Sequence, residues 1–129
     1  MILLDSHVLI WAVADSKRLS RAAASAIRRA RLGDGLAVSA ITAYEVAWQI
    51  ASGRVQAYGT VETSVLRFLD GVTIRPITPE IAALATQFPE DYPRDPADRI
   101  IGATARAEGM TLVTRDERIR RSPLLKTVW

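Results

Sequence analysis

The stretch Met1-Ile2-Leu3-Leu4-Asp5 decides the fold class predicted for this chain. Its four apolar residues have the length and composition of a short buried strand, and the run ends abruptly at a carboxylate. Short apolar runs followed by helix-like segments recur at Leu36–Val38 and at Met110–Thr114. Strands that alternate with helices form parallel βαβ units. The sequence therefore predicts an α/β protein: a three-layer α/β/α sandwich around a central, mostly parallel sheet.

Glycine and proline separate the remaining segments into helices and strands. Gly33-Asp34-Gly35, Gly53 and Gly109 each end a helix-like stretch, and Asp95-Pro96 begins one. No internal repeat and no long linker divides the chain, so residues 1–129 are expected to form one domain. Further strands are expected at Val72–Ile74 and Thr127–Trp129, and helices at residues 6–14, 21–32, 40–52, 60–70, 80–88, 96–108 and from about 116.

Composition excludes several classes of protein. The chain contains no cysteine, which rules out disulfides, thiolate metal sites and a thiol nucleophile. With 49% hydrophobic and 24% charged residues, it does not have the composition of a disordered chain. No apolar run approaches the ~20 residues of a membrane helix, so we expect no membrane association and a cytoplasmic location. The net charge is +3 and 15 of the 17 positive residues are arginine, which suits an anionic partner.

Four acidic residues from distant parts of the sequence are expected at one edge of the predicted sheet. Ligands of such sheets bind outside the carboxyl ends of the strands. Two of the acids follow strands, one lies in the second turn of a helix, and one lies in the first turn of another helix. They are Asp5 and Asp116 after the strands, and Glu45 and Asp98 in the helices.

Each acid also has a simpler structural interpretation. Asp5 and Asp116 are equally compatible with helix N-caps, and Asp98 with a favourable position in the dipole of its helix. Glu45 is harder to explain in this way, because it borders the apolar stripe formed by Ile41 and Trp48. A carboxylate there is costly unless it is paired or binds a metal. The occurrence of all four acids together is therefore stronger evidence for a functional site than any one of them.

Clustered carboxylates repel one another, so their convergence favours a bound cation. An oxygen-only donor set suits Mg²⁺ or Mn²⁺ better than Zn²⁺, for which His7 is the only histidine available. Such an ion activates water and neutralises the charge that develops on a phosphate. Together with the arginines, the acids indicate hydrolysis of phosphodiester bonds; the pattern leaves open whether one or two ions bind.

Four segments in this order resemble PIN-domain ribonucleases, specifically the VapC-type toxins of toxin–antitoxin pairs, and the resemblance covers essentially the whole chain. The segments are Leu3-Leu4-Asp5-Ser6-His7, Val38-Ser39-Ala40-Ile41-Thr42-Ala43-Tyr44-Glu45, Asp95-Pro96-Ala97-Asp98-Arg99-Ile100-Ile101 and Leu112-Val113-Thr114-Arg115-Asp116. Tyr44 stands where this subgroup commonly has tryptophan.

The resemblance implies an endoribonuclease toxin that depends on Mg²⁺ or Mn²⁺ and acts on RNA. It assigns the metal site, and with it catalysis, to Asp5, Glu45, Asp98 and Asp116. It also implies a homodimer and a cognate VapB-type antitoxin, whose C-terminal segment enters the groove and silences the enzyme.

Other polar residues beside the acids have two interpretations each. Ser6, Ser39 and Thr114 are candidates for orienting the acids, although ordinary turn or capping bonds explain them equally well. Arg99 and Arg115 are candidates for RNA phosphate contacts, or for balancing the acidic charge. The spacing favours Asp95 as a helix cap and leaves the role of His7 open.

Two other classes of function are compatible with parts of this pattern. A phospho-acceptor receiver domain also carries Asp residues at strand ends, but it needs a lysine at a late strand end. The only lysines, Lys17 and Lys126, are poorly placed for that. A non-catalytic RNA- or protein-binding module of PIN-like fold would bind without turnover.

Overall fold

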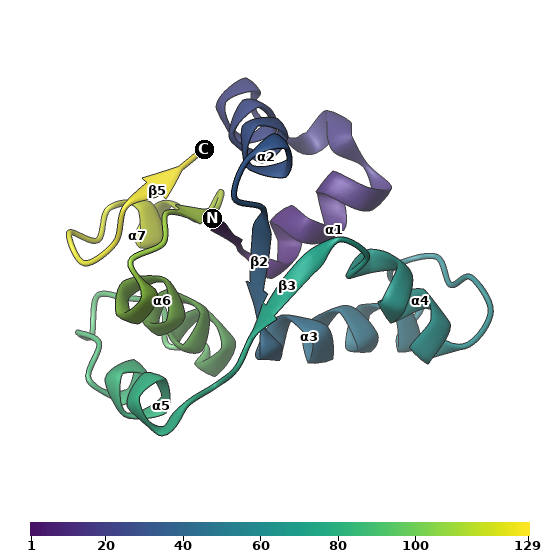
Figure 1. Cartoon of the computed structure of the whole chain (residues 1–129). Coiled ribbons are helices and arrows are strands. Elements are labelled where there is room, and N and C mark those ends of the chain that lie inside the picture. Colours follow the sequence, from purple (N-terminus) through teal and green to yellow (C-terminus); the bar gives the residue numbers. More distant parts are fainter.

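The computed structural model describes residues 1–129 and confirms the predicted α/β sandwich. Its core is a five-stranded sheet in which every neighbouring pair is parallel, in the order β3-β2-β1-β4-β5. Figure 1 shows β3 beside β2 and, toward the other side of the sheet, β5. The strands are β1 (Ile2–Leu4), β2 (Leu36–Ser39), β3 (Val72–Arg75), β4 (Leu112–Val113) and β5 (Thr127–Val128).

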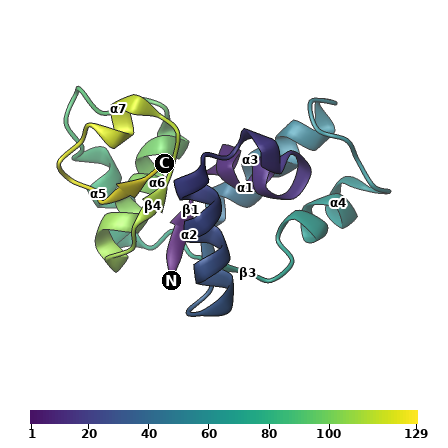
Figure 2. The same cartoon turned by 90° about the horizontal axis from the view of Figure 1, so that it is seen from above.

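Helices cover both faces of this sheet. One layer contains α1 (Ser6–Ala14), α2 (Arg21–Leu32), α3 (Ala40–Ala51) and α4 (Val61–Phe68), with a short 3₁₀ turn, η1 (Ser16–Arg18), after α1. The other layer contains α5 (Pro79–Thr86), α6 (Pro96–Glu108) and α7 (Glu117–Arg120). Figure 2 shows the two groups on opposite sides of the strands.

The alternation of side chains along each strand divides the core between the two layers. In β1, Leu3 packs into the cluster under α5 and α6, whereas Leu4 packs into the cluster under α1 and α2. In β2, Ala37 faces the first of these clusters, and its neighbour Val38 faces the second. Successive side chains of a strand point to opposite faces, so a strand buried on both sides is apolar throughout. This explains why the short strands are continuous apolar runs.

Most of the expected boundaries agree with the structure to within two residues. The largest differences are in the strand expected at Met110–Thr114, which pairs only over Leu112–Val113, and in η1, which the sequence did not predict. Gly109 ends α6 with a φ of 65°, the left-handed conformation that glycine adopts most readily. No helix is long and apolar enough to cross a membrane.

The strand order determines where the acidic residues meet. In the register of the sheet, Leu3 of β1 lies opposite both Ala37 of β2 and Leu112 of β4. Because the three strands are parallel, their carboxyl ends lie side by side at one edge. The segments that follow them, which lead into α1, α3 and α7, therefore begin close together.

Candidate active site

A cavity of about 620 Å³ lies at this carboxyl edge and is lined mainly by charged side chains. It contains all four acids that the sequence singled out, together with Asp95. Glu117 lies at its rim, where it forms an ion pair with Arg121 (3.2 Å). Basic residues also line the cavity: His7, Arg18, Arg115 and Arg118.

Asp5 is the most buried of these acids and is held on both carboxylate oxygens. It follows β1 directly, and its backbone amide donates to the carbonyl of Val113 (3.0 Å). Its Oδ1 accepts from the amide of Ser6 (2.9 Å), and its Oδ2 accepts from the hydroxyl of Thr114 (2.8 Å). Burial raises the pKa of the Asp5 carboxyl, and these two hydrogen bonds oppose the rise. Asp5 therefore caps α1 and also lines the cavity.

A chain of hydroxyl groups fixes Glu45. The hydroxyl of Ser6 donates to Oε1 of Glu45 (2.6 Å) and lies 2.9 Å from the hydroxyl of Thr42. Since Ser6 has one hydroxyl proton and donates it to Glu45, Thr42 must be the donor in the second bond. Burial raises the pKa of Glu45, so a donor at this position stabilises its charged form.

Thr114 joins two of the acids. Its hydroxyl donates to Asp5 and accepts from the amide of Asp116 (3.1 Å). Asp116 caps α7: its Oδ1 accepts from the amides of Arg118 (2.8 Å) and Ile119 (3.1 Å). Both of these bonds go to Oδ1, which leaves Oδ2 without a protein donor.

The amino-terminal end of α6 brings Asp95 and Asp98 to the same cavity. Asp98 is half-buried, and its pKa is raised to about 7, first by burial and then by the negative charges of Asp5, Asp95, Asp116 and Glu45. Asp95 occupies the N-cap position of α6, but its side chain makes no capping hydrogen bond. The expectation that Asp95 acts as the helix cap is therefore wrong for its side chain. The three-residue spacing of Asp95 and Asp98 could have placed both carboxylates on the same side of the helix, because residues three apart share one face.

The structure gives the other candidate residues different roles. Ser39 caps α3 by accepting from the amide of Ile41 (3.3 Å), so it has the capping role that the sequence left open. Arg99 donates all its side-chain N–H groups to backbone carbonyls and has none left for phosphate, so the expected phosphate contact at Arg99 is wrong. Arg115 does line the cavity, with its guanidinium 5.8 Å from the centroid of the Trp11 ring.

The donor set suits a hydrated divalent cation. No three acidic or histidine side chains are close enough together to enclose an ion directly. Mg²⁺, however, usually keeps several of its waters and binds through only one or two carboxylates. An open cavity lined by carboxylate oxygens fits such an ion, since burial and then the repulsion between these groups raise the pKa of Asp98 in its absence.

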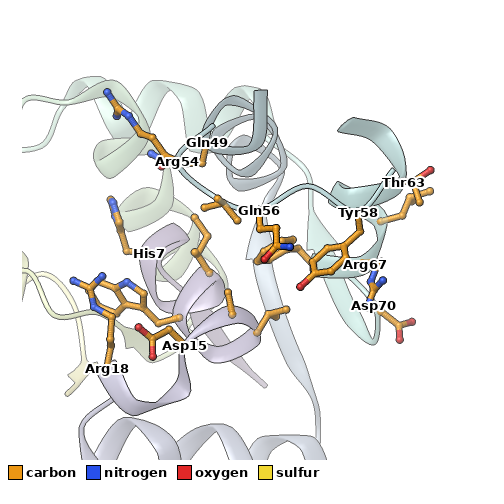
Figure 3. Close-up of a pocket in the computed structure, with 17 residues that line it drawn as sticks. His7, Asp15, Arg18, Gln49, Arg54, Gln56, Tyr58, Thr63, Arg67 and Asp70 are labelled. Atoms are coloured by element: carbon orange, nitrogen blue, oxygen red, sulfur yellow. The ribbon is translucent and has the colours of Figure 1, made fainter. Parts of the chain in front are cut away.

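A second, larger hollow of about 930 Å³ adjoins the acidic cavity and shares His7, Trp11 and Arg18 with it. Figure 3 shows Gln49, Arg54 and the residues around Tyr58 and Arg67 on the side of this groove opposite α1. About half of its lining is apolar. Its arginines stack on aromatic rings: Arg18 lies 4.6 Å from the centroid of Trp11, and Arg67 lies 4.3 Å from that of Tyr58.

The raised pKa of Asp98 predicts a specific pH dependence for the cation-free protein. Its folded-state pKa of about 7 lies above the ordinary value of 3.8, so this group favours folding below pH 3.8 and loses that contribution as the pH rises through 7. Asp98→Asn should therefore raise Tm relative to wild type by roughly 5 °C at about pH 8, with little difference near pH 4.

Thermal unfolding in EDTA across this range checks the prediction. Asp70→Asn, a change at an exposed carboxylate, is the control and should show no such pH-dependent difference. If the Tm of wild type and of Asp98→Asn changes with pH in the same way, the pKa of Asp98 is not raised and the prediction is contradicted.

Comparisons with known proteins identify the family of this chain. Residues 2–123 match the PIN domain family. The chain is 45% identical over 130 residues to Ribonuclease VapC22 of Mycobacterium tuberculosis, covering 99% of this chain and 98% of the relative. Its fold resembles VapBC2 from Rickettsia felis bound to a promoter DNA fragment, with a TM-score of 0.75 at 17% identity over 98% of this chain and 97% of that one. DNA-bound VapBC from Salmonella typhimurium gives 0.73 at 18% identity, with the same coverage. This chain belongs to the PIN-domain family.

Proposed function

We propose that this protein is an endoribonuclease toxin of the VapC type, which hydrolyses RNA phosphodiester bonds with the help of Mg²⁺ or Mn²⁺. The observation that carries the proposal is the cavity in which Asp5, Glu45, Asp98 and Asp116 meet at the carboxyl edge of the sheet. The 45% identity to a ribonuclease along nearly the whole of both chains supports RNA as the substrate.

In this mechanism the carboxylates would hold the cation, and the cation would supply the charge that activates the attacking water. Asp5, Asp98 and Asp116 would hold the ion, which supplies positive charge for the phosphate and makes water a better nucleophile. The hydrogen bonds from Thr114 to Asp5 and from Ser6 to Glu45 keep these side chains in place before substrate arrives. Burial raises the pKa of Glu45, which makes its carboxylate the better suited to accept a proton from water.

The arginines at the rim would bind the RNA backbone. Arg18, Arg115 and Arg118 line the cavity, are exposed and form no ion pair within the chain. Arginine is planar and permanently charged, and it matches phosphate oxygens with two parallel donors. Neither lysine lines the cavity, so the residue that a phospho-acceptor receiver domain needs is missing from it.

A VapB-type antitoxin is the proposed partner, because several of the solved structures that resemble this chain are VapBC complexes. The groove between α1 and α4 offers apolar surface for a peptide segment, including Val55 and Leu66. Since the groove shares His7, Trp11 and Arg18 with the acidic cavity, a segment lying in it would extend to the edge of that cavity. The homodimer that the resemblance implies stays a prediction.

Removing individual carboxylates should abolish RNA cleavage while the protein remains folded. Asp5→Asn and Asp98→Asn each remove one negative charge from the proposed cation site and should lower the cleavage rate by about 100-fold or more. EDTA should stop cleavage by wild type, and added Mg²⁺ or Mn²⁺ should restore it.

The measurement is the rate at which a fluorescently labelled RNA is cut, with Glu80→Gln, an exposed carboxylate on α5, as the matched control. Wild-type rates of RNA cleavage in both Asp5→Asn and Asp98→Asn would contradict the proposed function. RNA binding without cleavage by wild type would indicate a non-catalytic module instead.

A charge placed in the groove should separate antitoxin binding from catalysis. Leu66 is 64% exposed and lines the groove, so Leu66→Glu should weaken the complex with the VapB-type antitoxin by about tenfold or more. Cleavage of RNA by the free toxin should change little. Leu32→Glu is the control, because Leu32 is 91% exposed and lies outside the groove.

Isothermal titration calorimetry of both variants with the antitoxin measures this difference. Equal affinities for Leu66→Glu and Leu32→Glu would place the antitoxin on another surface.

A further inference from the structure

We infer that Arg99 is a positioning residue: its guanidinium ties the loop between α5 and α6 to the first turn of α6, and thereby holds Asp95 and Asp98 toward the other carboxylates. This inference rests on the proposed function, since it concerns the same cation site.

The hydrogen bonds of Arg99 account for every N–H group of its side chain. Nε donates to the carbonyl of Pro93 (3.0 Å). One terminal nitrogen donates to the carbonyls of Phe88 (2.8 Å) and Ala85 (3.4 Å), and the other to those of Pro89 (3.0 Å) and Tyr92 (3.4 Å). A guanidinium has five N–H groups in a fixed plane, and here five different carbonyls accept from them. Bonds from a charged donor are stronger than neutral ones.

These carbonyls belong to a segment that has few other partners. α5 ends at Thr86, and the last carbonyls of a helix have no intrahelical donor. A cation beside them also interacts favourably with the negative end of the helix dipole. The loop crosses from α5 to α6 without a strand or helix of its own, so Arg99 supplies the donors that a regular element would otherwise provide.

Arg99 is also linked through the backbone to the two acids Asp95 and Asp98. The amide of Arg99 donates to the carbonyl of Asp95 (3.2 Å), and Asp98 precedes Arg99 directly. Asp95 follows the bound carbonyl of Pro93 by two residues. Displacing the loop from Arg99 would therefore shift Asp95 and alter the first turn that carries Asp98.

Tyr92 provides a second, weaker tie between the loop and the helix. Its hydroxyl donates to the carbonyl of Asp98 (3.3 Å), and its ring packs edge-on against Phe88, with the ring centroids 4.7 Å apart. Gly102 leaves room for this packing, since a Cβ at that position would collide with the Tyr92 hydroxyl and the Phe88 ring. The loop thus packs on α6 on one side while its last residue, Asp95, lines the acidic cavity.

Hydrogen bonds that hold the α5–α6 loop against α6 are needed because the acids of the cavity repel one another. Asp95 makes no capping bond, and its negative charge acts on both Glu45 and Asp98. Repulsion would favour a loop position farther from the cavity unless other interactions opposed it. Lysine keeps the positive charge, but its three donors on one nitrogen cannot reach five carbonyls spread around a plane.

The test compares Mn²⁺ affinity, measured by isothermal titration calorimetry, in wild type, Arg99→Lys and Arg99→Met. We expect Mn²⁺ to bind about 10- to 100-fold more weakly to both variants, the usual effect of removing a group that orients a metal ligand. Amide hydrogen exchange of residues 87–95 should be faster, and kcat should recover partly at high Mn²⁺. Arg106→Met is the matched control: Arg106 also lies on α6 and donates to one carbonyl, that of Leu124 (2.8 Å), so Mn²⁺ affinity should not change.

Wild-type Mn²⁺ affinity in folded Arg99→Lys overturns the inference. If both Arg99 variants fail to fold, Tyr92→Phe tests the same tie from the loop side. It should show a smaller loss of Mn²⁺ affinity, and unchanged affinity there also overturns the inference. A wild-type protein that binds Mn²⁺ but does not cut RNA would contradict the proposed function and leave the role of Arg99 intact.

Discussion

Electrostatic repulsion among carboxylates gathered at one edge of a parallel sheet is the constraint on which this site depends. Asp5, Glu45, Asp95, Asp98 and Asp116 line one cavity, and burial together with their mutual charge raises the pKa of Asp98 to about 7. Such an arrangement is unfavourable unless donors hold each group and a cation neutralises the set. The hydroxyl and amide bonds around the cavity, and the tie that Arg99 makes to the α5–α6 loop, all oppose this repulsion.

Three segments of the fold supply the groups that donate hydrogen bonds around the carboxylates. The segment after β1 holds Asp5 and Ser6, the segment after β4 holds Thr114, and α3 holds Thr42. Through Thr114 the two neighbouring strands share one hydrogen-bonded unit, because its hydroxyl contacts both Asp5 and the amide of Asp116. The parallel pairing of β1 and β4 therefore places this hydrogen-bonded unit beside the acidic cavity.

Sequence reasoning predicted the strands and the four acids, because short apolar runs that end at carboxylates and the spacing of caps are local properties of the chain. It favoured a capping bond for Asp95 that the side chain does not make, and it offered Arg99 as a contact to phosphate or as a balance for the acidic charge. The role of Arg99 depends on contacts that are distant in the sequence. The five carbonyls that Arg99 contacts lie 6 to 14 residues before it, in a loop whose path no local pattern specifies. The groove beside the cavity was also not predicted, since α1 and α4 meet only through tertiary packing.

The central claim is that these carboxylates together form a site for a divalent cation. Anomalous X-ray diffraction from crystals of the protein soaked in Mn²⁺ tests it most directly, because the metal is located without reference to activity. The account predicts an anomalous peak inside the acidic cavity, within water-mediated or direct reach of Asp5, Asp98 and Asp116. No peak in that cavity at millimolar Mn²⁺, or a peak only at a distant surface carboxylate, would contradict it.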